Sequence, residues 1–297
     1  MNHTYIVAHN AFTVSAPDDL AAWKELEPRF KPFECRGGDT SSLEIRIISA
    51  PLPPCDGESI YRPEHDGIGF ITAQAWRLAD GSLAMEFRHV EECEPRVMMK
   101  MPARLDHAEI VIAPDGDSND TYFLSHALMI AYMLGTSGNG TLLIHASAVT
   151  HGSKAYLFQG RSGTGKSTHA SLWTRNIDGA ELLNDDHPVI RFTADGTAMA
   201  YGSPWSGKTH CYRNVAAPIG AFVRIVRGKE NVLRQLPLLN AYASLTSSVF
   251  FVPFLSDKLR DVRHAVVERL ASTVPCYEMH CRPDDDAAIT CCNGLKR

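Results

Sequence analysis

The chain has 297 residues, of which 44% are hydrophobic and 21% charged, and its formal net charge is −5. This length and apolar content suit one large domain or two smaller ones with buried cores. The acidic balance argues against a nucleic-acid-binding protein, which usually carries a concentrated basic face. The N-terminus has no basic stretch followed by a long apolar run, and no later stretch is long enough to cross a bilayer. We therefore expect a cytoplasmic protein without membrane or nucleic-acid partners.

The first 115 or so residues are predicted to be rich in β-strand, because short segments rich in Ile, Phe and Val alternate with turn residues. Asp80-Gly81 between two such segments is typical of a hairpin turn, and residues 36–39 form another turn-like stretch. Residues 18–30 have helical spacing of apolar side chains. The expected strands are residues 42–49, 67–76, 82–89 and 96–101.

A polar, turn-rich patch at residues 113–119 indicates a domain boundary. We therefore expect a β-rich N-terminal domain at residues 1–118 and a second domain at residues 119–297. Residues 122–134 then read as a helix with a broad apolar face, followed by a flexible connector at residues 135–140.

From residue 141 onward, apolar strand-like segments alternate with helical ones, which predicts an α/β core and an overall fold class of α+β or α/β. The expected strands are residues 142–149, 155–159, 181–184, 188–192 and 274–280. The expected helices are residues 167–175 and 257–270.

The eight cysteines include no CxxC pair, and a chain of this length does not need a disulfide framework. We expect free thiols in a reducing compartment. Cys276 and Cys281 lie close to His280, but their spacing matches no zinc pattern, and we assign no metal to them.

Residues 160–167 read GRSGTGKS and match the phosphate-binding pattern GxxxxGK[ST]. The glycines let backbone N–H groups converge on phosphate oxygens, and the following helix presents its positive end to an anion. Lys166 would supply a charge for the outer phosphates, and the Ser167 hydroxyl would ligate Mg²⁺. An apolar strand precedes the loop and a helix follows it, as this motif requires. The predicted nucleotide-binding residues are Gly160, Arg161, Ser162, Gly163, Thr164, Gly165, Lys166, Ser167 and Thr168.

Asp185 and Asp186 are candidates to hold a metal ion beside the loop. A helix from residue 167 to 176 descends about 15 Å, and a strand over residues 180–184 climbs back about 16 Å. The two carboxylates should therefore return to the level of the phosphate loop. A solvated pair at a strand end is the alternative interpretation. His145 ends another apolar run, where a lone histidine is more often structural than catalytic.

His145-Ala-Ser, the loop at residues 160–167 and the LLNDD segment at residues 182–186 together resemble the C-terminal catalytic domain of HPr kinase/phosphorylase. That bacterial enzyme phosphorylates a serine of a small carrier protein, and its domain shares a nucleotide-binding core with phosphoenolpyruvate carboxykinase. The similarity covers residues 145–192. It implies a carboxykinase-like P-loop core that uses ATP and Mg²⁺.

The resemblance also implies roles for individual residues. Lys166 would bind phosphate, and Ser167 and Asp185 would hold magnesium. One residue of the pair Asp185 and Asp186 would hold metal and the other would act as general base, with His145 hydrogen-bonded to that base. The four catalytic candidates are therefore Asp185, Asp186, His145 and Lys166.

The chain departs from this family after the acidic pair, where the EVRGxG-like signature is missing. Residues 202–208, GSPWSGK, take its place, so HPr as a substrate, a phosphorylase reaction and a hexamer are not implied. Trp205, Gly207 and Lys208 are candidate substrate residues, and a surface turn that buries one tryptophan is the alternative. Arginines that could supply a transition-state cation are Arg213, Arg224 and Arg227.

These motifs predict a kinase that transfers a phosphoryl group from ATP to a serine-like hydroxyl of a protein, a peptide or a small metabolite. One alternative is a carboxykinase-like enzyme, which would need more basic residues to hold a dicarboxylate. Another is a non-catalytic nucleotide-binding switch. The sequence leaves open whether the chain forms a homo-oligomer.

Overall fold

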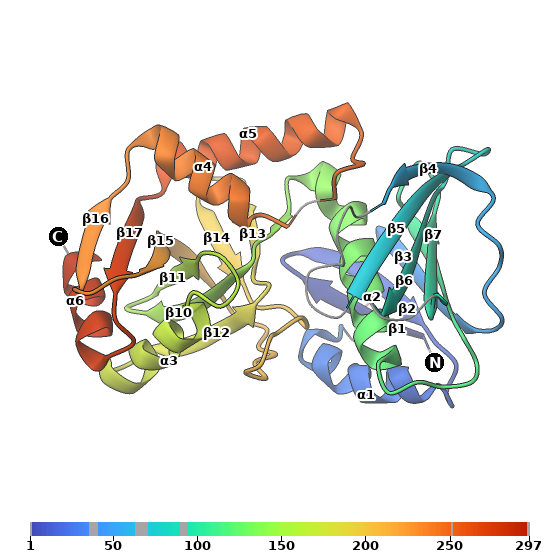
Figure 1. Cartoon of the computed structure of the whole chain (residues 1–297), viewed down its shortest axis with the longest axis horizontal. Coiled ribbons are helices and arrows are strands. Elements are labelled where there is room, and N and C mark those ends of the chain that lie inside the picture. The colour runs from blue at the N-terminus through green and yellow to red at the C-terminus, as the bar shows by residue number, and fades with distance from the viewer. Residues whose placement is uncertain (1, 36–40, 63–70, 90–93, 251, 296–297) are drawn as a thin grey trace. The chain divides into compact units, whose positions relative to one another are not determined.

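The computed structural model describes residues 2–35, 41–62, 71–89, 94–250 and 252–295. The chain divides into two compact units, Met1–Gly138 with Val252–Leu255 and Asn139–Phe251 with Ser256–Arg297. Each unit has its own sheet (Figure 1). None of the described helices is long and apolar enough to span a membrane.

The first unit is built on a sheet whose described strands have the order β1-β2-β3-β8-β7-β6-β5-β4. Burial alternates along β2 and β3, because successive side chains of a strand point to opposite faces. The strands are β1 (Asn2–Val7), β2 (Asn10–Ser15), β3 (Leu43–Ser49), β4 (Gly57–Tyr61), β5 (Ile71–Leu78), β6 (Leu83–His89), β7 (Val97–Met101) and β8 (His107–Ile112).

Three helical segments belong to this unit: α1 (Ala21–Phe30), the short 3₁₀ helix η1 (Lys31–Phe33) and α2 (Asp120–Thr136). The α2 helix is apolar almost all round, so it is buried, and it packs on β7, β8 and β3. The unit therefore extends to Gly138 and includes the helix that we expected in the second domain.

The second unit contains a mixed sheet with the strand order β12-β10-β11-β15-β14-β13-β9, to which β17 and β16 are added beside β15. Its strands are β9 (Leu142–Leu143), β10 (Ala146–His151), β11 (Lys154–Gln159), β12 (Glu181–Asp186), β13 (Val189–Phe192), β14 (Ala198–Tyr201), β15 (Ala216–Arg227), β16 (Val232–Gln235) and β17 (Cys276–Cys281). Its helices are α3 (Lys166–Asn176), α4 (Leu238–Ser248), α5 (Asp257–Thr273) and α6 (Asp285–Leu295). The short 3₁₀ helix η2 (Ser137–Asn139) lies where the chain passes from the first unit into the second.

Two hydrophobic clusters fill the two faces of this sheet. Leu157 belongs to the cluster that includes α4 and α5, whereas Phe158, the next residue of β11, belongs to the cluster that includes α3 and α6. This switch follows from the alternation of side chains along a strand. Figure 1 shows the two helix pairs on opposite sides of the sheet.

The long strand β15 connects the antiparallel and the parallel parts of the sheet. Its beginning pairs antiparallel with β14, and its later part runs parallel to both β11 and β17. The carboxyl ends of β11, β15 and β17 therefore lie at one edge, which is where ligands bind in open α/β sheets.

Most expected strands and helices are confirmed, with ends shifted by a few residues. The strand expected at residues 142–149 is wrong in one respect, because it breaks into β9 and β10 at Ile144 and His145. The Ile144 amide donates to Pro188 O (3.2 Å), the residue opposite it, but Pro188 has no N–H to return the bond. The His145 amide turns instead to Ser248 O (2.7 Å). The turn at residues 36–39 and the first part of the strand at residues 67–76 lie outside the described residues.

Candidate active site

The loop at residues 160–165 joins the end of β11 to the start of α3. Gly163 and Gly165 have φ angles of 75° and 108°, which residues with a side chain rarely adopt. The Thr164 hydroxyl donates to Arg161 O (2.8 Å) and closes the turn. No side chain caps the N-terminus of α3 among the described residues. The free amides of its first turn can therefore bind an anion.

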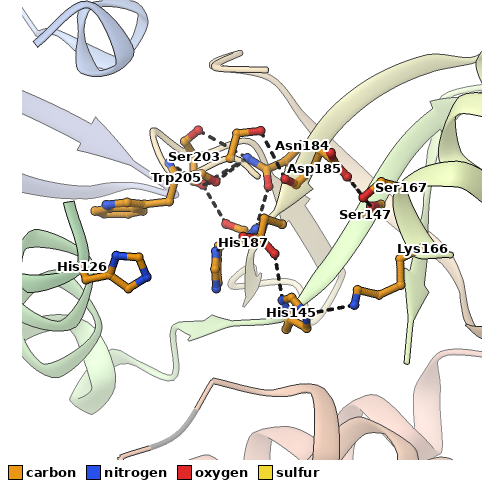
Figure 2. Close-up of polar contacts among 12 residues, drawn as sticks. His126, His145, Ser147, Lys166, Ser167, Asn184, Asp185, His187, Ser203 and Trp205 are labelled. Atoms are coloured by element: carbon orange, nitrogen blue, oxygen red, sulfur yellow. Dashed lines mark hydrogen bonds and ion pairs between the residues drawn. The ribbon is translucent and has the colours of Figure 1, made fainter. Parts of the chain in front are cut away.

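Lys166 projects from the first residue of α3 and is only 8% exposed. Its Nζ donates to Gly160 O (3.1 Å) and lies 2.9 Å from His145 Nε2 (Figure 2). Burial lowers the pKa of Lys166 below its usual range, although Asp186 and Asp185 oppose that shift. An anion bound beside this ammonium group would offset the cost of burying it.

His145 connects Lys166 to Asp186. Its Nδ1 is 2.8 Å from Asp186 Oδ1, on the ring edge opposite the nitrogen that contacts Lys166. An ammonium group can only donate, so His145 Nε2 accepts a hydrogen bond from Lys166. The His145 Nδ1 atom then carries the ring proton and donates a hydrogen bond to Asp186. The result is a hydrogen-bonded chain from the phosphate loop to the end of β12.

Asp186 receives a second histidine contact, since His187 Nδ1 lies 3.3 Å from its Oδ2. Burial opposes ionisation of Asp186, but hydrogen bonds from His145 and His187 outweigh it and hold the pKa of Asp186 well below its usual range. The carboxylate is therefore charged at neutral pH. Ligand atoms of these three residues lie within 4.8 Å of one another, so the group has the composition of a metal site, but the same atoms already bond to one another.

Asp185 occupies the other face of the strand end and is 1% exposed. It accepts a hydrogen bond from the Ser147 hydroxyl, and Thr209 N donates to its Oδ2 (3.2 Å). Ser147 Oγ is also 3.3 Å from Ser167 Oγ (Figure 2). The Ser147 hydroxyl thus contacts both Asp185 and Ser167. A buried carboxylate with neutral donors, beside a second hydroxyl, is an oxygen-rich set that fits Mg²⁺.

The segment at residues 202–208 packs directly against the acidic pair. Gly207 N donates to Asp185 O, and a Cβ at Gly207 would lie 2.8 Å from that oxygen, so only glycine fits there. Trp205 is 4% exposed, while Lys208 is exposed. The structure therefore brings Gly207 to the acidic pair and buries most of Trp205.

Asn184 ties the same segment to β12. Its Nδ2 donates to Ser203 Oγ (3.2 Å) and Trp205 O (3.0 Å), and its Oδ1 accepts from His187 N (2.9 Å). Figure 2 shows these contacts of Asn184. One fully buried amide thus fixes the loop and the backbone that carries Asp186 and His187.

The three candidate arginines have different environments. Arg213 Nη1 donates to Leu182 O (2.7 Å), and Arg224 lies 3.7 Å from Glu278. Arg227 Nη2 donates to Gly163 O in the phosphate loop. Arg227 therefore contacts the loop directly.

Sequence reasoning missed His187, Ser147 and Asn184 as site residues. His187 directly follows the acidic pair, and Asn184 directly precedes it. Ser147 is the serine of the His-Ala-Ser segment, so its place in the motif was a usable signal. Nothing in the spacing indicated that His187 would turn back onto Asp186.

No family model matches the chain, and no curated protein matches it significantly. Among solved structures, the HPr(Ser) kinase/phosphatase from Coxiella burnetii is similar with a TM-score of 0.30 and 10% identity. The match covers 52% of this chain and 92% of that one. A similarity at this level is weak and concerns the fold alone.

Proposed function

We propose that the chain is an ATP- and Mg²⁺-dependent kinase that transfers a phosphoryl group to a serine-like hydroxyl. The observation that carries this proposal is the chain of contacts from Lys166 through His145 to Asp186, which begins at a phosphate-binding loop. In this proposal the Lys166 cation binds phosphate, and the neighbouring pair of His145 and Asp186 acts on the hydroxyl. Phosphoryl transfer needs both, because catalysis rests on positioning and charge stabilisation.

The loop amides, the N-terminus of α3 and Lys166 bind the polyphosphate. Asp185 and Ser167 would hold Mg²⁺, which offsets negative charge on the phosphates when it is bound. Lys166 exchanges its contact with His145 for a phosphate oxygen. This exchange is favourable because the anion offsets the desolvation of the buried ammonium group.

The departure of Lys166 leaves His145 Nε2 free to accept a proton. Because the Nδ1 proton is hydrogen-bonded to Asp186, Nε2 has the lone pair that can accept a proton. The acceptor hydroxyl loses its proton to this nitrogen as its oxygen attacks the terminal phosphorus, and ADP leaves. Asp186 then stabilises the imidazolium. This assignment differs from the role implied by the family resemblance, in which an aspartate is the base.

The test is transfer of label from γ-labelled ATP to serine-containing peptides and hydroxylated metabolites. A hydroxyl acceptor gives an acid-stable phosphate ester, so label should survive acid and depend on Mg²⁺. Asp186→Asn should reduce the rate by about 100-fold. Asp195→Asn is the control, because this carboxylate accepts hydrogen bonds only from Thr193 and Thr197 in the contacts that the structure gives it, and the rate should be unchanged. Transfer that is equally fast in Asp186→Asn would contradict the proposal.

A further inference from the structure

Three side chains beside the proposed magnesium ligands have the composition of a transition-metal site. His145 Nδ1 is 2.8 Å from Asp186 Oδ1, and His187 Nδ1 is 3.3 Å from Asp186 Oδ2. One ligand atom from each of the three residues lies within 4.8 Å of the other two. Among the residues that the structure describes, this is the one group of three histidine, cysteine or acidic side chains with such spacing.

The spacing of these atoms is close to that of zinc ligands. Two ligands of a tetrahedral Zn²⁺ ion, each about 2.0–2.1 Å from the metal, lie about 3.3 Å apart. The contact of His187 with Asp186 already has this length, and the contact of His145 with Asp186 has to open by about 0.5 Å. The two imidazole rings have centres 5.7 Å apart (Figure 2). Small side-chain rotations can therefore bring the three atoms to one ion.

Solvent reaches this group. The side chains of His145 and Asp186 are 39% and 30% exposed, and that of His187 is 12% exposed. Three protein ligands leave the fourth position of a tetrahedral ion to solvent or to a substrate atom, as at catalytic zinc sites. An ion from solution can thus enter without opening of the fold.

The donor atoms differ from those expected to hold Mg²⁺. Two imidazole nitrogens and one carboxylate suit Zn²⁺ and related transition metals, whereas oxygen atoms suit Mg²⁺. The side chains of Asp185 and Ser167 offer oxygen atoms alone. The two neighbouring sites therefore have different metal preferences and share no side chain.

Metal binding at this group would reverse the tautomer of His145. In the structure Nδ1 donates to Asp186 and Nε2 accepts from Lys166. A neutral ring that binds a metal through Nδ1 has lost the Nδ1 proton and carries a proton on Nε2 instead. The Nε2 atom then has no lone pair for the proton of an acceptor hydroxyl or for the ammonium group of Lys166.

We propose that His145, Asp186 and His187 form an inhibitory transition-metal site, with Zn²⁺ as the ion that fits it. The inhibition rests on the proposed kinase function, because it requires His145 to be the base. Binding of the ion does not depend on that function. Zinc and Lys166 oppose each other, since the ammonium group loses its acceptor when Nε2 carries a proton.

Binding is measured by titrating the metal-free full chain with Co²⁺ alone, whose absorption bands report its ligands. Wild type should give the spectrum of nitrogen and oxygen ligands, and added Zn²⁺ should displace the Co²⁺. Asp186→Asn and His187→Gln should each weaken binding by more than about tenfold, since even residues that only support a ligand have that effect. His264→Gln is the matched control, because His264 is exposed on α5 and contacts Tyr242.

The Lys166→Ala variant tests the tautomer argument with an effect of opposite sign. It removes the cation that occupies the Nε2 lone pair of His145. Co²⁺ should therefore bind this variant at least about threefold more tightly than wild type, because a neighbouring positive charge is also removed. Weaker binding than in wild type would overturn the argument.

The remaining outcomes separate this proposal from the kinase proposal. An intense thiolate band, which would report one of the eight cysteines, or unchanged affinity in both Asp186→Asn and His187→Gln would overturn the metal site and leave the kinase proposal standing. Metal binding by a wild-type chain that transfers no phosphoryl group would contradict the proposed function and, with it, the inhibitory role.

Inhibition is measured in the transfer assay, with free Zn²⁺ set by a chelating buffer. A concentration that halves the wild-type rate should leave the rate of His187→Gln nearly unchanged, because this variant lacks one of the three ligands. Equal inhibition of the two proteins would overturn the inhibitory role.

Discussion

Asp186 has a φ of 152°, which lies outside the regions that residues with a side chain favour. Such a conformation costs about 1–3 kcal/mol and persists only where surrounding contacts impose it. Here His145, His187 and the bridge between Asp186 and Ser206 impose it. The strained backbone aims the carboxylate at two imidazoles, which is consistent with a positioned reactive group.

The low pKa of Asp186 predicts how acid affects the fold. Its folded-state pKa lies below the unfolded value of about 3.9, so its contribution to stability is present above about pH 4 and is lost as the pH falls further. The difference in free energy of unfolding between wild type and Asp186→Asn should shrink from pH 5 to pH 3. Urea denaturation at each pH measures it, and a difference that grows with acid would contradict the account.

The two histidines should contribute unequally to activity. His145 contacts both Lys166 and Asp186, whereas His187 contacts Asp186 alone of these two. We expect His145→Gln to lower kcat by about 100-fold and His187→Gln by about tenfold. Steady-state kinetics with a saturating acceptor measures both, and a larger loss in His187→Gln would contradict the assigned roles.

At this scale the sequence predicted the strand, the glycine-containing loop and the helix around residues 160–167, because glycines at fixed spacing shape such a turn. Phosphate binding by this loop stays a prediction. The sequence also placed Asp185 and Asp186 beside the loop, through the lengths of α3 and β12. It could not predict that His187 would contact Asp186, because that contact depends on a side-chain direction set by tertiary packing.

Among the elements, β12 and the segment at residues 202–208 depend on one another through Asn184. Truncation to Ala would leave the Ser203 hydroxyl, the Trp205 carbonyl and the His187 amide without this partner. We expect Asn184→Ala to lower the free energy of unfolding by about 2–3 kcal/mol. Asn176→Ala removes a half-buried amide at the end of α3 and should cost less than about 1 kcal/mol. Denaturant titrations compare the two, and equal losses would contradict the argument.

The strand β15 shows why some elements were missed. Pro218 and Gly220 lie inside it, and both residues usually argue against a central strand. Pro218 falls where the strand pairs with β14, and the register with β11 skips Gly220 in a bulge. Both residues are accommodated by tertiary context that the sequence does not display.

For the whole molecule, the expected boundary at residue 118 rested on a turn-rich patch that resembles a linker. In the structure Asp120 accepts from both Arg96 Nη2 (3.0 Å) and Asp117 N (2.8 Å), which ties the patch to the first unit. Composition alone could not show these bonds.

Nucleotide binding should therefore affect one unit. The loop, the ends of β15 and β17 and the acidic pair all belong to the second unit. With Mg·ATP, we expect slower amide hydrogen exchange at residues 160–168, 225–228 and 281–283, because bound ligand restricts local opening. Mass spectrometry measures the change, and slowing confined to Met1–Gly138 would contradict this placement.

The most direct test of the phosphate site is titration of Mg·ATP into two lysine variants. Lys166→Ala removes the buried ammonium of the loop, while Lys154→Ala removes an exposed one at the start of β11. The account predicts that Lys166→Ala weakens binding by at least about tenfold and that Lys154→Ala binds as wild type does. Wild-type affinity in Lys166→Ala would contradict it.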